Sequence, residues 1–250
     1  MRTYGLIGFP LTHSFSQKYF TEKFEKEGLT TCRYLNFPID RIDLINELTD
    51  KDDSLAGLNV TIPYKQQVMA YMHELDDISE NIGAVNTVKV IRTGERLRLK
   101  GYNTDAFGFY HSLKPLLKKK NDSALILGTG GSSKAVAYAL KELRINFTYV
   151  SRSPANKNIL GYNDLNEQVF NNYRIIINTS PAGMFPDTGA YPDIPYNLIT
   201  ADYVLYDLIY NPEETQFLKR GKERGALTIN GLRMLHLQAE KSWEIWNEED

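Results

Sequence analysis

The sequence of 250 residues contains one cysteine, Cys32, and almost no net charge. A single cysteine excludes an internal disulfide and a thiolate metal cluster. No run of about 18 consecutive apolar residues occurs, which excludes a membrane-spanning helix. With 29 basic and 31 acidic residues the formal charge is −2, so binding to nucleic acid through bulk charge is excluded too.

The composition is that of a globular protein, because 42% of the residues are hydrophobic and 24% are charged. The first apolar run, residues 4–11, is interrupted by Gly5, Gly8 and Pro10 and does not have the form of a secretory signal. We therefore expect a cytoplasmic protein, monomeric or homodimeric, with no nucleic-acid or membrane partner.

Short apolar or β-branched runs alternate with helical patterns along the whole chain, which predicts an α/β fold. In the first half, strands are expected at residues 4–7, 32–37, 55–60, 85–91 and 96–99, and helices at 16–26 and 63–72. In the second half, strands are expected at 123–127, 147–150, 174–178, 204–207 and 227–229, and helices at 105–117, 131–143 and 232–246. The pattern predicts two α/β halves, residues 1–104 and 105–231, and a C-terminal helix in 232–250 that packs back on the first half.

A glycine-rich turn, Gly128-Thr129-Gly130-Gly131-Ser132, follows a buried-type strand and opens a helix. Such a turn lets the backbone approach a pyrophosphate closely at the N-terminus of a helix. The dinucleotide fingerprint is incomplete, because its third glycine would fall on Ser133. A dinucleotide site and a tight structural turn both fit these residues.

The residues after the next strand distinguish NAD from NADP. An NAD-binding fold usually has an Asp or Glu about 20 positions beyond the glycines, to bind the ribose hydroxyls. Here the sequence is Ser151-Arg152-Ser153, without a carboxylate. Arg152 suits a 2′-phosphate, because guanidinium pairs with phosphate through two parallel donors, so NADP is favoured. The alternative is a surface arginine at the end of a strand.

Polar residues also gather at strand ends in the first half. Ser14 and Ser16 stand where a strand leads into a helix, and a helix N-cap explains one serine but not both. Neighbouring His13 is interpreted as a turn residue. Thr61 and Lys65 follow the third strand, and strand ends are where α/β proteins bind ligands.

Asp105 opens the helix after Gly101-Tyr102-Asn103-Thr104, where an N-cap role is one explanation. The other is a Lys65–Asp105 pair across a cleft, which would protonate the alkoxide that forms when a carbonyl is reduced. An ordinary exposed lysine remains the alternative for Lys65.

These motifs, in this order and over nearly the whole chain, resemble the shikimate dehydrogenase family. The family reduces 3-dehydroshikimate with NADPH in chorismate and aromatic amino-acid biosynthesis. The resemblance implies a substrate-binding domain at 1–104, a Rossmann-type NADP-binding domain at 105–231 and a cytoplasmic oxidoreductase without a metal. It implies catalytic roles for Lys65 and Asp105, and substrate contacts from Ser14, Ser16, Thr61, Asn86, Asp105, Tyr210 and Gln238. It implies cofactor contacts from Gly128, Thr129, Gly130, Gly131, Ser132, Ser151, Arg152, Ser153, Leu208 and Gly231.

The sequence departs from the family pattern at a few positions. Gln17 replaces the usual proline after the second serine, and Ser151 replaces an asparagine near the adenosine. Asn156 stands where many members have a second arginine, which weakens the preference for NADP unless Lys157 substitutes. Asp77, sometimes assigned near the cofactor in the family, is interpreted as a surface acid.

Two rival functions follow from the same motifs. One is a quinate/shikimate dehydrogenase that uses NAD, against which Arg152 argues. The other is a non-catalytic sensor of shikimate or dinucleotide, against which Lys65 and Asp105 argue. A folate-linked dehydrogenase has no support from the serine pair.

Overall fold

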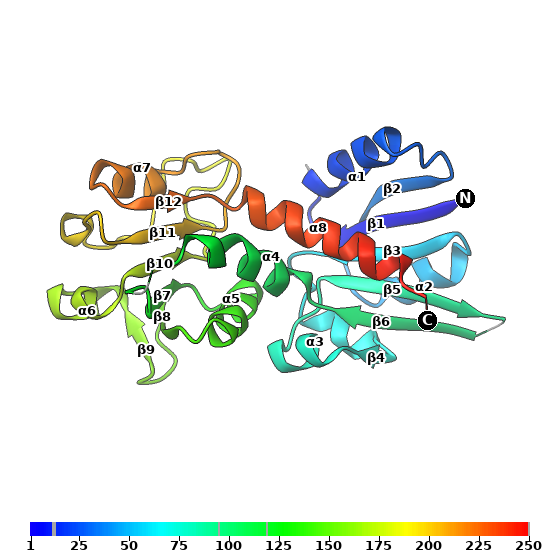
Figure 1. Cartoon of the computed structure of the whole chain (residues 1–250). Helices are drawn as coiled ribbons and strands as arrows, with labels where there is room; N and C mark the ends of the chain where they lie inside the picture. The colour runs from blue at the N-terminus through cyan, green and yellow to red at the C-terminus, as the bar shows by residue number, and fades with distance from the viewer. Residues whose placement is uncertain (12–13, 95, 119, 250) are drawn as a thin grey trace. The chain divides into compact units, whose positions relative to one another are not determined.

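The computed structural model describes residues 1–11, 14–94, 96–118 and 120–249 of the chain. Its contacts divide into two compact units. The first consists of Met1–Thr104 and Ala239–Asp250, and the second of Asp105–Gln238. Each unit has a six-stranded sheet with helices on both faces (Figure 1). The predicted α/β fold class is therefore confirmed.

The sheet of the first unit has the strand order β2-β1-β3-β5-β6-β4. Its strands are β1 (Arg2–Gly8), β2 (Cys32–Pro38), β3 (Leu55–Val60), β4 (Glu74–Leu75), β5 (Thr87–Thr93) and β6 (Arg96–Tyr102). Strand β1 is parallel to β2 and β3, whereas β5 is antiparallel to both β3 and β6. The helical segments are α1 (Phe15–Lys26), α2 (Leu44–Lys51), η1 (Gln67–Tyr71) and α3 (Asp77–Ile82).

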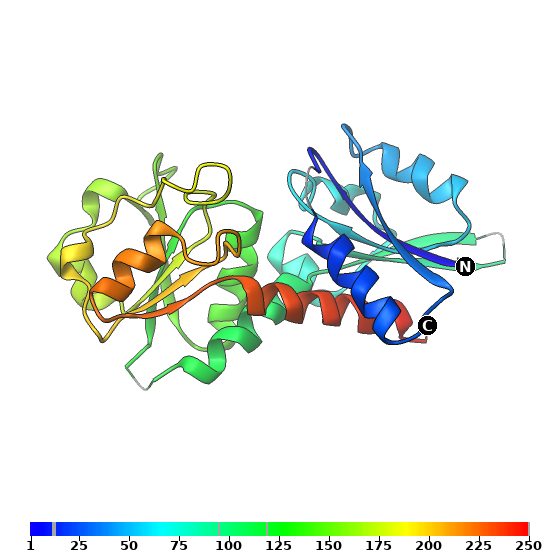
Figure 2. The same cartoon turned by 90° about the horizontal axis from the view of Figure 1, so that it is seen from above.

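Side chains along β1 point alternately to the two faces of this sheet. Tyr4 and Leu6 pack with Phe20 of α1 and Trp246 of the C-terminal helix, while Ile7 joins the core on the other face. Figure 2 shows α1 and this C-terminal segment on one side of the sheet and α2 on the other. Period-two alternation is what a strand covered on both faces requires.

The second unit has an entirely parallel sheet in the order β12-β11-β10-β7-β8-β9. Its strands are β7 (Ser123–Leu127), β8 (Asn146–Ser151), β9 (Ile159–Gly161), β10 (Ile175–Asn178), β11 (Val204–Asp207) and β12 (Leu227–Ile229). Read from β9, this is the doubly wound order 3-2-1-4-5-6 of dinucleotide-binding folds. The chain reverses direction across the sheet beside β7, which is where such folds bind their ligand.

Helices cover both faces of this second sheet. Its helical segments are α4 (Thr104–Leu113), η2 (Lys114–Leu116), α5 (Gly131–Glu142), η3 (Tyr162–Asp164), α6 (Glu167–Asn172), η4 (Tyr196–Leu198) and α7 (Gln216–Glu223). Ala124 and Ile126 of β7 pack with α4 and α5, whereas Leu125 and Leu127 face the core of α6 and α7. Helix α8 (Leu232–Asn247) begins in this unit, and its residues from Ala239 onward belong to the first.

One predicted helix is wrong. The segment expected to be helical over residues 63–72 consists of turns up to Gln66 and the short 3₁₀ segment η1. The turn is held by one local and one distant bond, because Tyr64 N donates to Thr61 O at 2.9 Å and Val85 N donates to Lys65 O at 2.7 Å. The second bond uses a carbonyl that a longer helix would need for itself. His13 lies outside the described residues.

Candidate functional site

In the first unit, the predicted substrate-binding residues meet at one edge of the sheet. Strands β1 and β3 are parallel and adjacent, so the segments after them, which carry Ser14 and Thr61, lie at the same edge. Strand β5 runs antiparallel to β3, which places Asn86, the residue before β5, at this edge too. The backbone confirms the proximity, because Val60 N donates to Asn86 O at 2.8 Å.

A glycine lets the two turns approach each other. A Cβ on Gly8 would lie 2.5 Å from Thr61 Cγ2 and 3.0 Å from Ile62 O. Phe9 N donates to Ile62 O at 3.2 Å, and Thr61 N donates to Ile7 O at 2.9 Å. Any side chain at position 8 would push the turns apart.

Ser14 and Ser16 occupy different positions at the start of α1. Ser14 is the N-cap, and its Oγ accepts a hydrogen bond from Gln17 N at 3.1 Å. Accepting that bond uses a lone pair and keeps the hydroxyl proton for another acceptor. Ser16 is in the first turn and buried. The first turn carries no acidic side chain, so its amides and dipole favour a small anion.

In the second unit, the turn after β7 has the geometry of an anion cradle. Gly128 has φ +116°, and a Cβ there would lie 2.8 Å from Thr179 Oγ1. Gly130 is the N-cap of α5 and has no side chain to cap the helix; a Cβ built on it meets no neighbouring described atom within 4 Å. The space in front of Gly130 and the uncapped amides of Gly131 and Ser132 fit a pyrophosphate.

Arg152 lines a pocket of about 950 Å³ in this unit. The pocket lies beyond the ends of β8 and β10, and its walls include Tyr162, Ser180 and Phe185. Burial raises the pKa of the Tyr162 hydroxyl, and the nearby Arg152 charge opposes this shift. The Oγ of Ser151 accepts a bond from Ser153 N at 3.2 Å and shapes the turn around Arg152. A cation beside aromatic and backbone groups suits a phosphorylated nucleoside.

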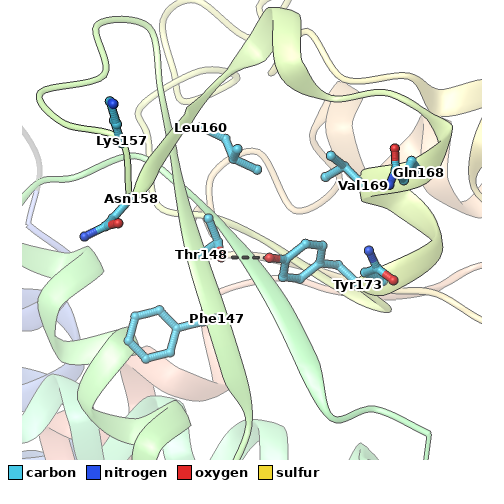
Figure 3. A pocket seen from close by; sticks show the side chains of 9 residues that line it. Phe147, Thr148, Lys157, Asn158, Leu160, Gln168, Val169 and Tyr173 are labelled. Atoms are coloured by element: carbon cyan, nitrogen blue, oxygen red, sulfur yellow. Dashed lines mark hydrogen bonds between the residues drawn. The ribbon is translucent and has the colours of Figure 1, made fainter.

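A second pocket, of about 500 Å³, lies across β8 and β9 toward α6 (Figure 3). Its walls include Phe147 and Thr148, and Thr148 Oγ1 shares a hydrogen bond of 2.7 Å with the Tyr173 hydroxyl. Lys157 lines this pocket, whereas Arg152 lines the larger one. The structure therefore associates Lys157 with a different cavity from that of Arg152.

The remaining predicted site residues belong to the second unit. Leu208 and Gly231 are in contact, because a Cβ on Gly231 would lie 2.0 Å from Leu208 O. Tyr210 follows in the same loop and is 37% exposed. Asp105 and Gln238 are buried on α4 and α8.

Helices α4 and α8 pack closely where Gly108 has no side chain. A Cβ on Gly108 would lie 2.5 Å from Met234 O and 3.2 Å from Gln238 Cβ. Asp105 is one helical turn before Gly108, so Asp105 and Gln238 stand on neighbouring helices. Asp105 is within the first turn of α4, where a carboxylate interacts favourably with the helix dipole.

Sequence reasoning missed a buried carboxylate at the end of β11. Asp207 is fully buried, and its Oδ1 accepts bonds from Asn178 Nδ2 at 3.0 Å and Ile209 N at 3.1 Å. Its Oδ2 accepts a bond of 2.6 Å from Thr215 Oγ1. These bonds join the ends of β10 and β11 to each other and to the N-cap of α7. The sequence signal that could have indicated Asp207 is its position as the last residue of a four-residue buried strand.

Burial raises the pKa of Asp207 from its ordinary 3.8 to about 6, although the three hydrogen bonds oppose the shift. The difference corresponds to about 3 kcal/mol. Since the folded pKa lies above the unfolded one, the folded protein binds a proton between about pH 4 and 6 that the unfolded chain has released. The contribution of Asp207 to the free energy of unfolding therefore falls as pH rises through this window.

We expect Asp207→Asn to remove this pH dependence. From about pH 4 to about pH 8, the free energy of unfolding of the wild type should fall by about 3 kcal/mol relative to that of the variant. Urea unfolding at intervals across the range measures the difference. Asp122→Asn, which changes an exposed aspartate before β7, is the control and should leave the profile parallel to that of the wild type. A wild-type minus Asp207→Asn difference that is constant with pH would contradict the prediction.

Within the described residues, no three His, Cys, Asp or Glu side chains are arranged to hold a metal ion. No helix among those residues is long and apolar enough to cross a membrane.

The chain is similar to known proteins over its whole length. The shikimate dehydrogenase substrate binding domain model matches residues 6–88. The NADP(+) shikimate dehydrogenase of Methanococcus vannielii is 40% identical in an alignment that covers 97% of this chain and 90% of that protein. The chain belongs to the shikimate dehydrogenase family. The family assignment predicted from the motifs is thus confirmed.

Solved structures of the family share the fold. Shikimate 5-dehydrogenase of Thermus thermophilus, in complex with NADP(H) and shikimate, is 29% identical with a TM-score of 0.85, and the match covers 99% of this chain and 94% of that one. Quinate dehydrogenase of Corynebacterium glutamicum, in complex with NAD, is 26% identical with a TM-score of 0.85, and the match covers 98% and 93%. The same fold thus occurs with either substrate and either cofactor, so residues must decide between them.

Proposed function

We propose that this chain is a shikimate dehydrogenase, which reversibly reduces 3-dehydroshikimate to shikimate with NADPH. The observation that carries the proposal is the 40% identity, across 97% of the chain, to an NADP(+)-dependent member of the family. The geometry agrees with it, since the segments that carry Ser14, Thr61 and Asn86 meet at one edge of the first sheet. We further propose that the protein acts in the cytoplasm as a monomer or homodimer.

In this proposal the first unit binds the substrate. Ser14 and Ser16 donate their hydroxyl protons to the substrate carboxylate at the N-terminus of α1. Thr61 and Asn86 bind its ring hydroxyls from the ends of β3 and β5, and Tyr210 and Gln238 add contacts from the second unit. Hydroxyls and amides suit a polyhydroxylated acid, because each both donates and accepts hydrogen bonds.

The second unit binds the cofactor through the turn at residues 128–132. The amides of Gly131 and Ser132 hold the pyrophosphate, Arg152 holds the 2′-phosphate, and Ser151 and Ser153 shape the loop around it. Thr129, Leu208 and Gly231 line the rest of the site. When bound, NADPH supplies the hydride that is transferred to the carbonyl carbon.

Lys65 supplies the proton. As the C3 carbonyl carbon accepts a hydride, its oxygen becomes an alkoxide and takes a proton from the Lys65 ammonium group. The reduced product then carries one new C–H and one new O–H bond, and Lys65 is left neutral. In the reverse direction Lys65 removes the proton. Asp105 orients the substrate and the lysine.

Initial rates of shikimate oxidation test the function. We expect turnover with NADP at least about tenfold faster than with NAD, because one charge-assisted phosphate contact is typically worth that much. Arg152→Ala should raise the KM for NADP about tenfold and leave the KM for shikimate unchanged. Faster turnover with NAD, or of quinate, would instead support the quinate/shikimate alternative. Shikimate binding without turnover would support a sensor.

A further inference from the structure

A continuous set of buried polar side chains leads to the Asn86 position of the first unit. Its members come from β2, β3, β5, the start of α4 and α8: Tyr34, Asn59, Thr87, Thr104 and Ser242. All five are at most 4% exposed. Buried polar groups are costly unless they are hydrogen-bonded, and in this set each member is hydrogen-bonded to at least one other member.

One end of the set is the Tyr34 hydroxyl. It donates its one proton to Asn59 Oδ1 at 2.8 Å. This bond determines which side of the Asn59 amide carries the oxygen.

The other end reaches Asn86. The hydroxyls of Thr87, Thr104 and Ser242 form a triangle with sides of 2.8, 3.1 and 3.2 Å. Thr104 closes this end, because its backbone N donates to Asn86 Oδ1 at 2.6 Å and its Oγ1 accepts from Asn86 Nδ2 at 3.0 Å. These bonds specify which side of the Asn86 amide carries the NH₂ group.

Asn59 joins the two ends. Its Oδ1 accepts from Tyr34, and its Nδ2 donates to Ser242 Oγ at 3.0 Å and contacts Thr87 Oγ1 at 3.3 Å. Reversing the Asn59 amide would set its NH₂ group against the Tyr34 donor. The orientation of each group is thus determined by its neighbours along the set.

We propose that Tyr34 and Ser242 are positioning residues for substrate binding, and that both act through the Asn86 amide, Tyr34 by way of Asn59. The inference rests on the proposed function, because it takes Asn86 as a substrate contact. Ser242 is on α8, nearly 140 residues beyond Thr104, so the last helix of the chain helps to shape a site whose direct ligands are far from it in sequence.

Double-mutant cycles on shikimate affinity, measured by calorimetry, test the inference. Tyr34→Phe should weaken shikimate binding about fivefold, which is typical for the loss of one hydrogen bond, and should leave NADP binding unchanged. In an Asn86→Ala background the same change should have no further effect. Ser242→Ala should likewise weaken binding about fivefold in the wild type and not in an Asn86→Ala background. If Ser242→Ala does not fold, Thr87→Val, which keeps the shape of the side chain, replaces it in the same test.

Two controls separate positioning from general stability. Tyr4 belongs to the same aromatic cluster as Tyr34, and no hydrogen bond joins its hydroxyl to the set among the described contacts. Ser79 is fully buried in the same unit and its Oγ donates to Asp76 O and Gly101 O. Tyr4→Phe and Ser79→Ala should leave shikimate affinity unchanged, whatever they do to the unfolding temperature.

The outcomes distinguish failure of the inference from failure of the function. If Asn86→Ala weakens shikimate binding and Tyr34→Phe does not, Tyr34 has no positioning role. If Tyr34→Phe weakens binding equally with and without Asn86, its effect does not pass through Asn86. Both results overturn the inference and leave the function intact. If neither the wild type nor any variant binds shikimate, the proposed function itself is wrong.

Discussion

Lys65→Ala is expected to lower kcat for shikimate oxidation by about a thousandfold while shikimate still binds, because positioned proton transfer typically contributes a factor of about 10²–10⁴. The fold should survive, since the hydrogen bond from Val85 N to Lys65 is made to the backbone carbonyl. Initial rates and calorimetry on the same preparation separate the two effects. A small primary amine added to the variant should restore part of the rate, because it replaces the missing proton acceptor.

Lys18→Ala is the matched control. Lys18 is on α1 of the same unit, its side chain is 78% exposed, and it pairs with Glu22 one helical turn away. Its removal should leave kcat unchanged, because exposed ion pairs contribute little to stability. If Lys65→Ala keeps more than about a tenth of the wild-type kcat, Lys65 is not the proton carrier.

Gly130→Ala should weaken NADP binding by at least about tenfold without unfolding the protein, since the second glycine of this turn lets the backbone approach the pyrophosphate. The structure places no neighbouring described atom within 4 Å of the added Cβ, and φ is −78°. The cost to the fold is therefore at most the N-cap preference, less than about 1 kcal/mol. Calorimetry with NADP and thermal unfolding measure the two quantities.

Gly231→Ala, unlike Gly130→Ala, should destabilise the fold. Its Cβ would lie 2.0 Å from Leu208 O, which is backbone and cannot rotate away. We expect a loss of about 3 kcal/mol and a Tm lower by roughly 6–12 °C. Gly189→Ala, whose Cβ meets no neighbouring described atom within 4 Å, is the control and should change neither Tm nor NADP affinity. If Gly130→Ala binds NADP like the wild type, the turn at residues 128–132 is structural.

The strands were predictable because their signal is local. Residues 55–60 and 123–127 are short apolar runs bounded by polar or turn residues, and the structure has strands at Leu55–Val60 and Ser123–Leu127. The glycine turn after the second of these was predictable for the same reason. Residues 63–72 were not, because Pro63 at a helix start is a local preference, and the bond from Val85 N to Lys65 O comes from a loop 20 residues later.

The residues of the candidate site also divide into those with a local sequence signal and those without one. Ser14, Thr61, Lys65 and Arg152 were recognised because each stands at the end of a predicted strand, where α/β folds bind ligands. Tyr34 and Ser242 were not, because nothing in their sequence neighbours distinguishes them from core residues. Asp207 has one local signal, its place at the end of a buried strand, but that signal does not reveal its partners. The partners of Tyr34, Asp207 and Ser242 are 25, 29 and 183 residues away, at Asn59, Asn178 and Asn59 again.

By itself the sequence determined the α/β class, the family, the glycine turn and the absence of an acid after β8, since each depends on residue types within a short window. Only the tertiary structure decided which hydroxyls lie together and which way the Asn59 and Asn86 amides face. The physical reason is that a hydrogen bond needs two atoms within about 3 Å, and the sheet order brings such atoms together from distant segments. Burial then makes each of these bonds obligatory, because an unpaired polar group away from water is costly.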